Sequence, residues 1–154
     1  MRVLTIYNES QRKTLFRSRI IDGFEFATLI YHSVQLTPVY EYYKVTENNS
    51  LAVIKTKLQD VGYGMPSTEE GKVIFKDGFM ELSQKNRTIE ELRFRVSHLN
   101  SPALLLGNES ISLNLFVEDG ELLIFRATSE SLLESLLEGE INGFQEETKT
   151  RTFP

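Results

Sequence analysis

Residues 74–81 read "IFKDGFME", an Asp-Gly pair between two short runs of apolar and β-forming residues. Two-residue Asp-Gly loops favour the type I′ turn, whose positive φ values match the twist of paired strands. The same arrangement recurs in "RIIDGFEF" at 19–26 and in "FVEDGELL" at 116–123. The pairs Asp22-Gly23, Asp77-Gly78 and Asp119-Gly120 therefore predict three antiparallel hairpins, and residues 47–50 predict a longer hairpin loop.

Strands are predicted wherever apolar and polar residues alternate and β-branched or aromatic side chains are frequent. The stretch "VYEYYKV" at 39–45 carries bulky groups on both of its faces, which indicates a strand that is covered on each side. The predicted strands are 3–7, 14–21, 24–34, 39–46, 51–58, 73–76, 79–83, 110–117 and 121–127.

Residues 88–99 fit two kinds of element. Thr88 and Glu91 have the spacing of a capping box, and the segment ends before Pro102, which is typical of a helix. The segment also alternates apolar and charged side chains from Leu92 to Val96, which is typical of a strand. We expect a helix here, with the strand as the alternative. The apolar stripe of that helix would contain Ile89, Leu92, Val96 and Leu99.

A second helix is predicted in "SESLLESLLEGEING" at 129–143. Ser129 or Thr128 would cap its start, and Gly139 or Gly143 would end it. Four leucines form a broad apolar stripe, and glutamates spaced four apart occupy the other face. The leucines of this stripe are Leu132, Leu133, Leu136 and Leu137.

Hairpins followed by helices predict an α+β fold. We expect a mainly antiparallel β-sheet built from Asp-Gly hairpins, with about two α-helices of the C-terminal half packed on one face. Its length of 154 residues is that of one domain, which we place at 1–143. Residues 144–154 are polar, lack a core pattern and are predicted to form a C-terminal tail.

Composition narrows the classes of function. The chain contains no cysteine, which excludes disulfides, thiolate-bound zinc and a thiol nucleophile. The apolar runs are shorter than a signal peptide or a membrane span requires, so we expect a cytoplasmic protein without membrane contact.

Residues 1–100 carry 14 basic and 12 acidic side chains, whereas residues 101–154 carry 3 basic and 10 acidic ones. The chain has a net charge of −5, so we do not expect it to bind nucleic acid in general. The affinity of a protein for nucleic acid depends mainly on neutralising the phosphate charges with basic side chains.

Catalytic and cofactor motifs are poorly matched. The glycine-rich stretch "DVGYGMPSTEEGK" at 60–72 lacks the lysine that a Walker A loop needs, and it precedes a predicted strand. Neither His32 nor His98 is followed by a second histidine at metal-ligand spacing. We therefore expect no metal, no cofactor and no catalytic residues, although the sequence does not show which of its 22 acidic residues lie together.

The leading hypothesis is a non-catalytic binding protein, such as an inhibitor, an immunity-type protein or an adaptor. Its acidic C-terminal face would meet a basic partner protein, and pairing of edge strands would extend this to a homo-oligomer. The predicted partner-binding residues are Glu130, Glu134, Glu138 and Glu140.

The alternative is a protein that binds a small molecule, nucleotide or phosphate ligand, or a small phosphoester-handling enzyme. It would use the loop between Gly62 and Gly71 together with a basic strip and a histidine. The residues of this alternative site are Arg12, Lys13, Arg17, Arg19, Gly62, Gly64, Ser67 and His32. A third hypothesis, a viral or cellular structural component, is not separated from the first by the sequence.

Overall fold

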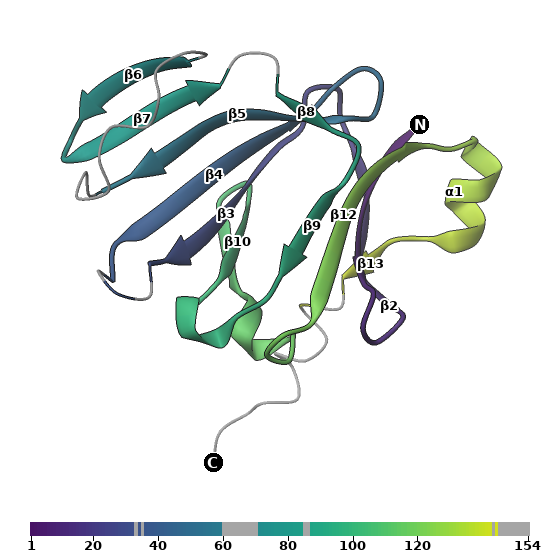
Figure 1. The fold of residues 1–154 in the computed structure, drawn as a ribbon. Helices are drawn as coiled ribbons and strands as arrows, with labels where there is room; N and C mark the ends of the chain where they lie inside the picture. Colours follow the sequence, from purple (N-terminus) through teal and green to yellow (C-terminus); the bar gives the residue numbers. More distant parts are fainter. Residues whose placement is uncertain (33, 35, 60–70, 85–86, 143, 145–154) are drawn as a thin grey trace.

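The computed structural model describes residues 1–32, 34, 36–59, 71–84, 87–142 and 144. Two antiparallel sheets pack against each other, as Figure 1 shows. Sheet A has the strand order β13-β2-β1-β12-β9. Sheet B has the order β11-β10-β3-β4-β5-β7-β6, and β8 pairs with β5 beside this path. The described part of the chain thus buries its apolar side chains between two layers of strands.

The bounds of the elements follow the chain. Sheet A contains β1 (Arg2–Asn8), β2 (Lys13–Ile20), β9 (Leu92–Arg95), β12 (Leu122–Ser129) and β13 (Ile141–Asn142). Sheet B contains β3 (Glu25–Tyr31), β4 (Pro38–Val45), β5 (Leu51–Leu58), β6 (Gly71–Lys76), β7 (Phe79–Gln84), β8 (Thr88–Ile89), β10 (Ala103–Leu106) and β11 (Glu109–Ser112). The helical elements are the 3-10 turns η1 (His98–Asn100) and η2 (Leu113–Leu115) and the α-helix α1 (Leu132–Glu138).

The predicted α+β class is wrong. Strands make up 57% of the structure and helices 11%, with one short α-helix in place of two packed helices. The first expected helix, 88–99, is divided among β8, β9 and η1. Strand β9 pairs with β12, so that Leu92 lies opposite Phe125 and Phe94 lies opposite Leu123. This pairing supplies the free edge of β12 with hydrogen-bond partners, which local helix propensity does not take into account.

One of the three predicted Asp-Gly hairpins is confirmed. Asp77 and Gly78 have φ values of 53° and 78° and join the paired strands β6 and β7, as a type I′ turn requires. The hairpin loop between β4 and β5 is also confirmed. The pair Asp22-Gly23 instead connects β2 of sheet A to β3 of sheet B, and Asp119-Gly120 precedes β12 without pairing it to β11. Turn chemistry fixes the reversal of the chain, whereas the partner of each strand depends on the whole sheet.

A row of aromatic rings crosses the interface between the two sheets. Phe26 of β3 stacks on Tyr43 of β4 at a centroid distance of 5.1 Å and on Phe125 of β12 at 5.5 Å. Phe94 of β9 then meets Phe125 edge to face at 6.5 Å. Phe125 is fully buried, and Phe26 and Tyr43 are nearly so. This row is the centre of the core because it joins two strands of each sheet.

The core extends past residue 143, where the expected domain ends. Phe144 is 3% exposed and packs against Phe16 and Phe116. The remainder of the expected tail, 145–154, lies outside the described residues.

Candidate functional site

Helix α1 is inverted with respect to an ordinary surface helix. Its four leucines, which we call the leucine face, point to solvent, whereas Ser135 is 1% exposed and turned toward the protein. The exposed fractions are 62% for Leu132, 67% for Leu133, 62% for Leu136 and 78% for Leu137. The expectation that this stripe packs on the sheet is therefore wrong. Four large apolar side chains are left without a covering among the described residues.

The sequence signals for the ends of α1 are partly correct. Ser131, rather than Ser129 or Thr128, is the N-cap, because β12 continues through Ser129. The Ser131 hydroxyl accepts a hydrogen bond from the backbone N–H of Glu134 at 3.2 Å, and the Glu134 carboxylate accepts one from the Ser131 N–H at 2.8 Å. The latter bond holds the pKa of Glu134 below its usual value. Gly139 ends the helix with a φ of 67°, as predicted.

Arg17 fastens α1 to sheet A. Its side chain is 5% exposed, donates to the carbonyl oxygen of Gly139 at 2.6 Å and forms an ion pair with Glu138 at 3.1 Å. A further ion pair and hydrogen bond join Arg17 to Glu130, whose side chain is 20% exposed. Arg19 donates to the Ser135 hydroxyl at 3.2 Å. The basic strip and the acidic segment, expected to serve different ligands, thus contact each other and hold α1 in place.

The other predicted site residues are distributed over the molecule. Glu134 caps α1, and Glu140 is exposed after the helix. Arg12 and Lys13 are exposed at the turn between β1 and β2. His32 lies in the β3–β4 loop of sheet B, where its Nδ1 accepts a hydrogen bond from the backbone N–H of Val34 at 3.3 Å. The remaining residues of the alternative site, Gly62, Gly64 and Ser67, lie outside the described residues.

A cavity of about 480 Å³ lies beside Arg17 on the outer face of sheet A. Thr5 lines it and lies between Arg17 of β2 and Arg126 of β12 in the strand register. Arg126 forms an ion pair with Glu91, and the pKa of Glu91 is lowered by hydrogen bonds from Arg126 and Arg93. The arginines around this cavity are therefore already paired with carboxylates of the same chain, which leaves little charge for an ionic ligand.

The outer face of sheet B carries lysines and aromatic rings that the strand register brings together. Tyr40 of β4 lies opposite Lys57 of β5, which lies opposite Glu81 of β7 and then Ile74 of β6. The neighbouring row runs from Tyr42 through Lys55 and Ser83 to Lys72. Because side chains alternate along each strand, these rows share one face of the sheet. We call this surface the lysine–aromatic face, and it contains Tyr40, Tyr42, Lys55, Lys57, Lys72, Ile74, Lys76, Phe79, Glu81 and Ser83.

Direct contacts join the lysines of this face to its rings. The Nζ atom of Lys55 lies 4.8 Å from the ring centroid of Tyr42, and that of Lys57 lies 4.5 Å from the ring centroid of Phe79. Such cation–π contacts keep the ammonium groups over apolar surface. The sequence signal was incomplete, because "VYEYYKV" brings one lysine of its own and the others come from β5 and β6.

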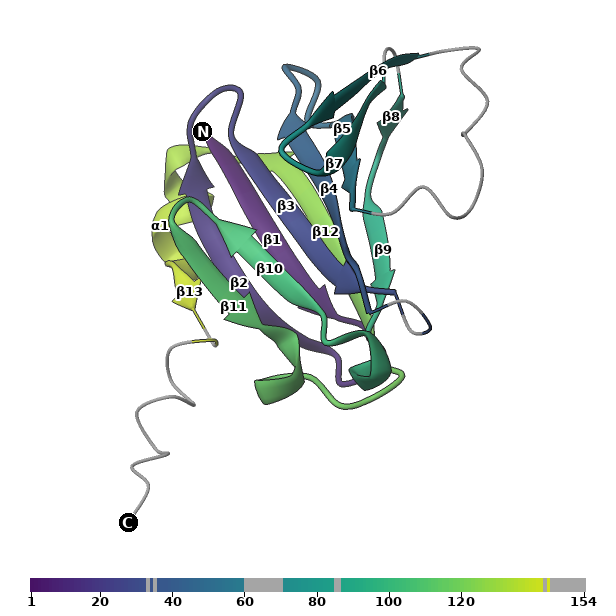
Figure 2. The same cartoon turned by 90° about the vertical axis from the view of Figure 1, so that its left-hand side faces the viewer.

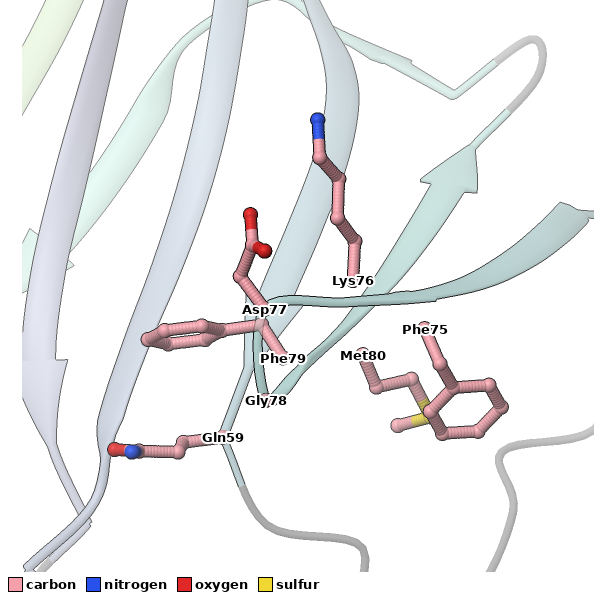
Figure 3. A pocket seen from close by; sticks show the side chains of 7 residues that line it. All are labelled: Gln59, Phe75, Lys76, Asp77, Gly78, Phe79 and Met80. Carbon is pink, nitrogen blue, oxygen red and sulfur yellow. The ribbon is translucent and has the colours of Figure 1, made fainter.

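A pocket of about 280 Å³ lies at the tip of the β6–β7 hairpin, next to this face. Figure 3 shows Phe75 and Met80 together on one side of the hairpin, with the Phe79 ring and Gln59 on the other. Phe75 is 63% exposed and Ile74 is 40% exposed. The hairpin therefore presents apolar side chains beside Lys76.

A polar network closes the turn that follows β1. Asn8 is fully buried, and its Nδ2 donates to the carboxylate of Glu121 at 2.8 Å. Burial raises the pKa of Glu121, but hydrogen bonds from Asn8, the Glu118 backbone and Gln11 outweigh it, so the pKa lies below its usual value. A carboxyl group whose pKa is lower in the folded than in the unfolded protein stabilises the fold at pH values above its unfolded-state pKa. This stabilisation is lost as the pH falls through the folded-state pKa.

Replacing Asn8 with Ala is expected to raise the pKa of Glu121 and to lower the free energy of unfolding at pH 7 by about 2 kcal/mol. The stability lost by the native protein between about pH 5 and pH 3 should then become smaller in the variant. Urea unfolding at both pH values and an NMR titration of the Glu121 carboxyl group measure these effects. Gln11→Ala, which removes an exposed partner of the same carboxylate, serves as the control with a smaller change. An unchanged Glu121 pKa in the Asn8 variant would contradict the assignment.

Among the described residues, no group of His, Cys, Asp and Glu side chains could hold a metal ion. None of the helices in this part of the chain combines the length and apolar character of a membrane span.

The fold and its surfaces define a two-sheet antiparallel β protein with one exposed apolar helix. Residues 26–113, more than half of the chain, match the model of a family described as a domain of unknown function, DUF1850, and the chain belongs to that family. The matched range contains sheet B except for Glu25, the first residue of β3, and ends before α1. No curated protein and no solved structure shows a significant match.

Proposed function

We propose that this protein is a non-catalytic binding protein that recognises another protein through the leucine face of α1. The observation that carries the proposal is the inverted polarity of the helix, with four leucines exposed and a serine buried. Clustered exposed apolar side chains mark interaction sites more often than single ones do, because their burial against a partner is favourable.

The leucine face is prepared for binding by the contacts behind it. An isolated helix of seven residues is unstable in water. Here the capping box of Ser131 and the contacts of Arg17 with Glu138 and Gly139 hold the helix in place before any partner arrives. Ordering a surface in advance reduces the entropy lost on association and so increases affinity.

The charges around the leucine face indicate the chemistry of the partner. Residues 130–140 contain four glutamates and no lysine or arginine. Glu134, Glu138 and Glu140 are exposed, and within the described part of the chain only Glu138 of these three forms an ion pair, with Arg17, so the rim of the face is acidic. A partner with an apolar surface bordered by basic side chains is complementary to this rim. Two leucine faces docked symmetrically would instead place their glutamates against one another.

A binding role is further supported by the ion pairs that the charged side chains form with each other. The arginines and glutamates near the cavity of sheet A form ion pairs with each other, as Arg17 does with Glu130 and Arg126 with Glu91. A catalytic site usually leaves such groups directed at a substrate, with pKa values tuned for proton transfer. The paired groups fit a structural role better.

The test uses the variant Leu133→Ser/Leu137→Ser, which we call the leucine variant. Both side chains are exposed, so its free energy of unfolding should stay within about 0.5 kcal/mol of the native value. The partner is first captured from a cell extract on immobilised native protein and identified, and its purified form is then titrated by calorimetry. Affinity should fall at least about tenfold in the leucine variant, since truncated interface anchors each contribute more than about 1 kcal/mol.

Leu99→Ser is the matched control, because Leu99 is 83% exposed on η1, outside the leucine face. It should bind the purified partner like the native protein. Equal affinity of the native protein and the leucine variant would refute the proposed site.

A further inference from the structure

We propose that the leucine face of one molecule docks on the lysine–aromatic face of a second copy of this chain, in a head-to-tail arrangement. The inference rests on the proposed function, since it identifies the partner of the same leucine face. It is carried by the complementarity of two surfaces that belong to one sequence.

The two surfaces match in both apolar and charged groups. The leucine face offers four leucines inside an acidic rim formed by Glu134, Glu138 and Glu140. On sheet B, the rings of Tyr40, Tyr42 and Phe79 and the side chain of Ile74 form an apolar area among lysines. The lysines of this area are Lys55, Lys57, Lys72 and Lys76, of which Lys55 already pairs with Glu81 at 3.7 Å. This surface has the apolar area and the basic border that the leucine face requires.

The positions of the surfaces determine the type of assembly. In both views, α1 lies at one end of the molecule and the β6–β7 hairpin at the other (Figure 1, Figure 2). A single chain therefore does not satisfy both surfaces itself. Contact between two different surfaces leaves one of each kind free on every pair, so it produces a ring or an open chain.

Nucleic acid is the competing occupant of the lysine–aromatic face, because rings and positive charge also bind single strands. Three observations favour an acidic protein surface instead. The ammonium groups of Lys55 and Lys57 occupy the ring faces on which bases would stack. Glu81 lies within the same row of side chains. The chain as a whole carries a net charge of −5, which opposes binding to a phosphate backbone.

The association is expected to be weak and dependent on concentration. A helix of seven residues is about 10 Å long, so the contact is smaller than a standard stable interface. Because exposed charges contribute, the association should weaken several-fold when the salt concentration is raised from about 50 mM to about 500 mM.

Sedimentation velocity of the purified full chain, from about 10 µM to about 1 mM, measures the association directly. Two variants each remove one surface: the leucine variant, and Lys72→Glu/Ile74→Ser, which we call the sheet variant. The native protein should form oligomers, and each variant alone should sediment as a monomer. An equimolar mixture of the two should form a dimer and nothing larger, because each variant retains the surface that the other has lost. Leu99→Ser and Lys13→Glu, which change exposed residues elsewhere, should associate like the native protein.

Other results would overturn the inference. A native protein that is monomeric over the whole range excludes the second copy, while the proposed function stays testable with the captured partner. Oligomers that survive in the sheet variant but not in the leucine variant place the docking surface elsewhere. Binding of a single-stranded oligonucleotide that is lost in the sheet variant, with no self-association of the native protein, identifies nucleic acid as the occupant. Far-UV circular dichroism of each variant before sedimentation ensures that the compared chains are folded.

Discussion

Phe125→Ala should lower the free energy of unfolding by about 4 kcal/mol, the largest effect expected from a single substitution in this protein. Phe125 is fully buried and lies between Phe26 of the opposite sheet, at 5.5 Å, and Phe94 of the neighbouring strand, at 6.5 Å. Its removal opens a cavity between the two sheets, where the surrounding strands relax only partly. Urea unfolding followed by circular dichroism measures the loss.

Two controls distinguish the loss of stability caused by the cavity from the effect of removing an aromatic ring at any position. Phe125→Leu keeps most of the volume and should cost less than about 1.5 kcal/mol. Phe75→Ala removes a ring that is 63% exposed and should change the stability by less than about 0.5 kcal/mol. Similar losses for Phe125→Ala and Phe75→Ala would show that the aromatic row is not the centre of the core.

Arg17→Met should lower the free energy of unfolding by about 3 kcal/mol, because it leaves a partly buried carboxylate without its partner. Glu130 is 20% exposed and loses its ion pair, and the carbonyl oxygen of Gly139 loses a donor. Hydrogen exchange should show faster opening of the amides of α1, since Arg17 also holds Glu138 at 3.1 Å. Urea unfolding gives the size of the loss.

The double variant Arg17→Met/Glu130→Gln tests the reason for that loss. It removes the unpaired charge and should recover part of the stability, so the two substitutions should not be additive. Arg87→Met is the matched control, because Arg87 is 58% exposed and its ion pair with Glu41 is long at 3.9 Å, and it should cost less than about 1 kcal/mol. An additive double variant would contradict the buried ion pair.

The leucine face and the lysine–aromatic face differ in how far the sequence revealed them. The leucines and glutamates of α1 predict a helix with an apolar and an acidic side, and Gly139, one of the two glycines predicted to end it, does so. Which side would face the protein was predicted wrongly. An amphipathic pattern gives two faces, and the burial of one of them depends on what lies beside the helix. Here Arg17 and Arg19 of β2 meet the polar side of α1 and turn the leucines outward.

The lysine–aromatic face could not be read from any single stretch. Its lysines lie on β5 and β6 and its rings on β4 and β7, and antiparallel register brings these residues together. The same reason explains the error at 88–99, where alternation of Leu92 and Phe94 with arginines competed with a capping-box spacing. Residues 92–95 form a strand because they pair with the edge of β12 that β1 leaves free.

The sequence by itself determined strands β1 to β7 and β12, the turn at Asp77-Gly78 and the position of the helix that follows β12, because each depends on neighbours along the chain. Tertiary structure alone decided which strands pair outside the β4–β5 and β6–β7 hairpins, which sheet each strand joins and which face of α1 meets solvent. These outcomes depend on the burial of apolar surface between distant segments and on the pairing of buried charge, as Arg17 pairs with Glu130. The periodicity of the side chains shows which residues share one face of a helix or strand. Whether that face is buried or exposed depends on which other elements pack against it.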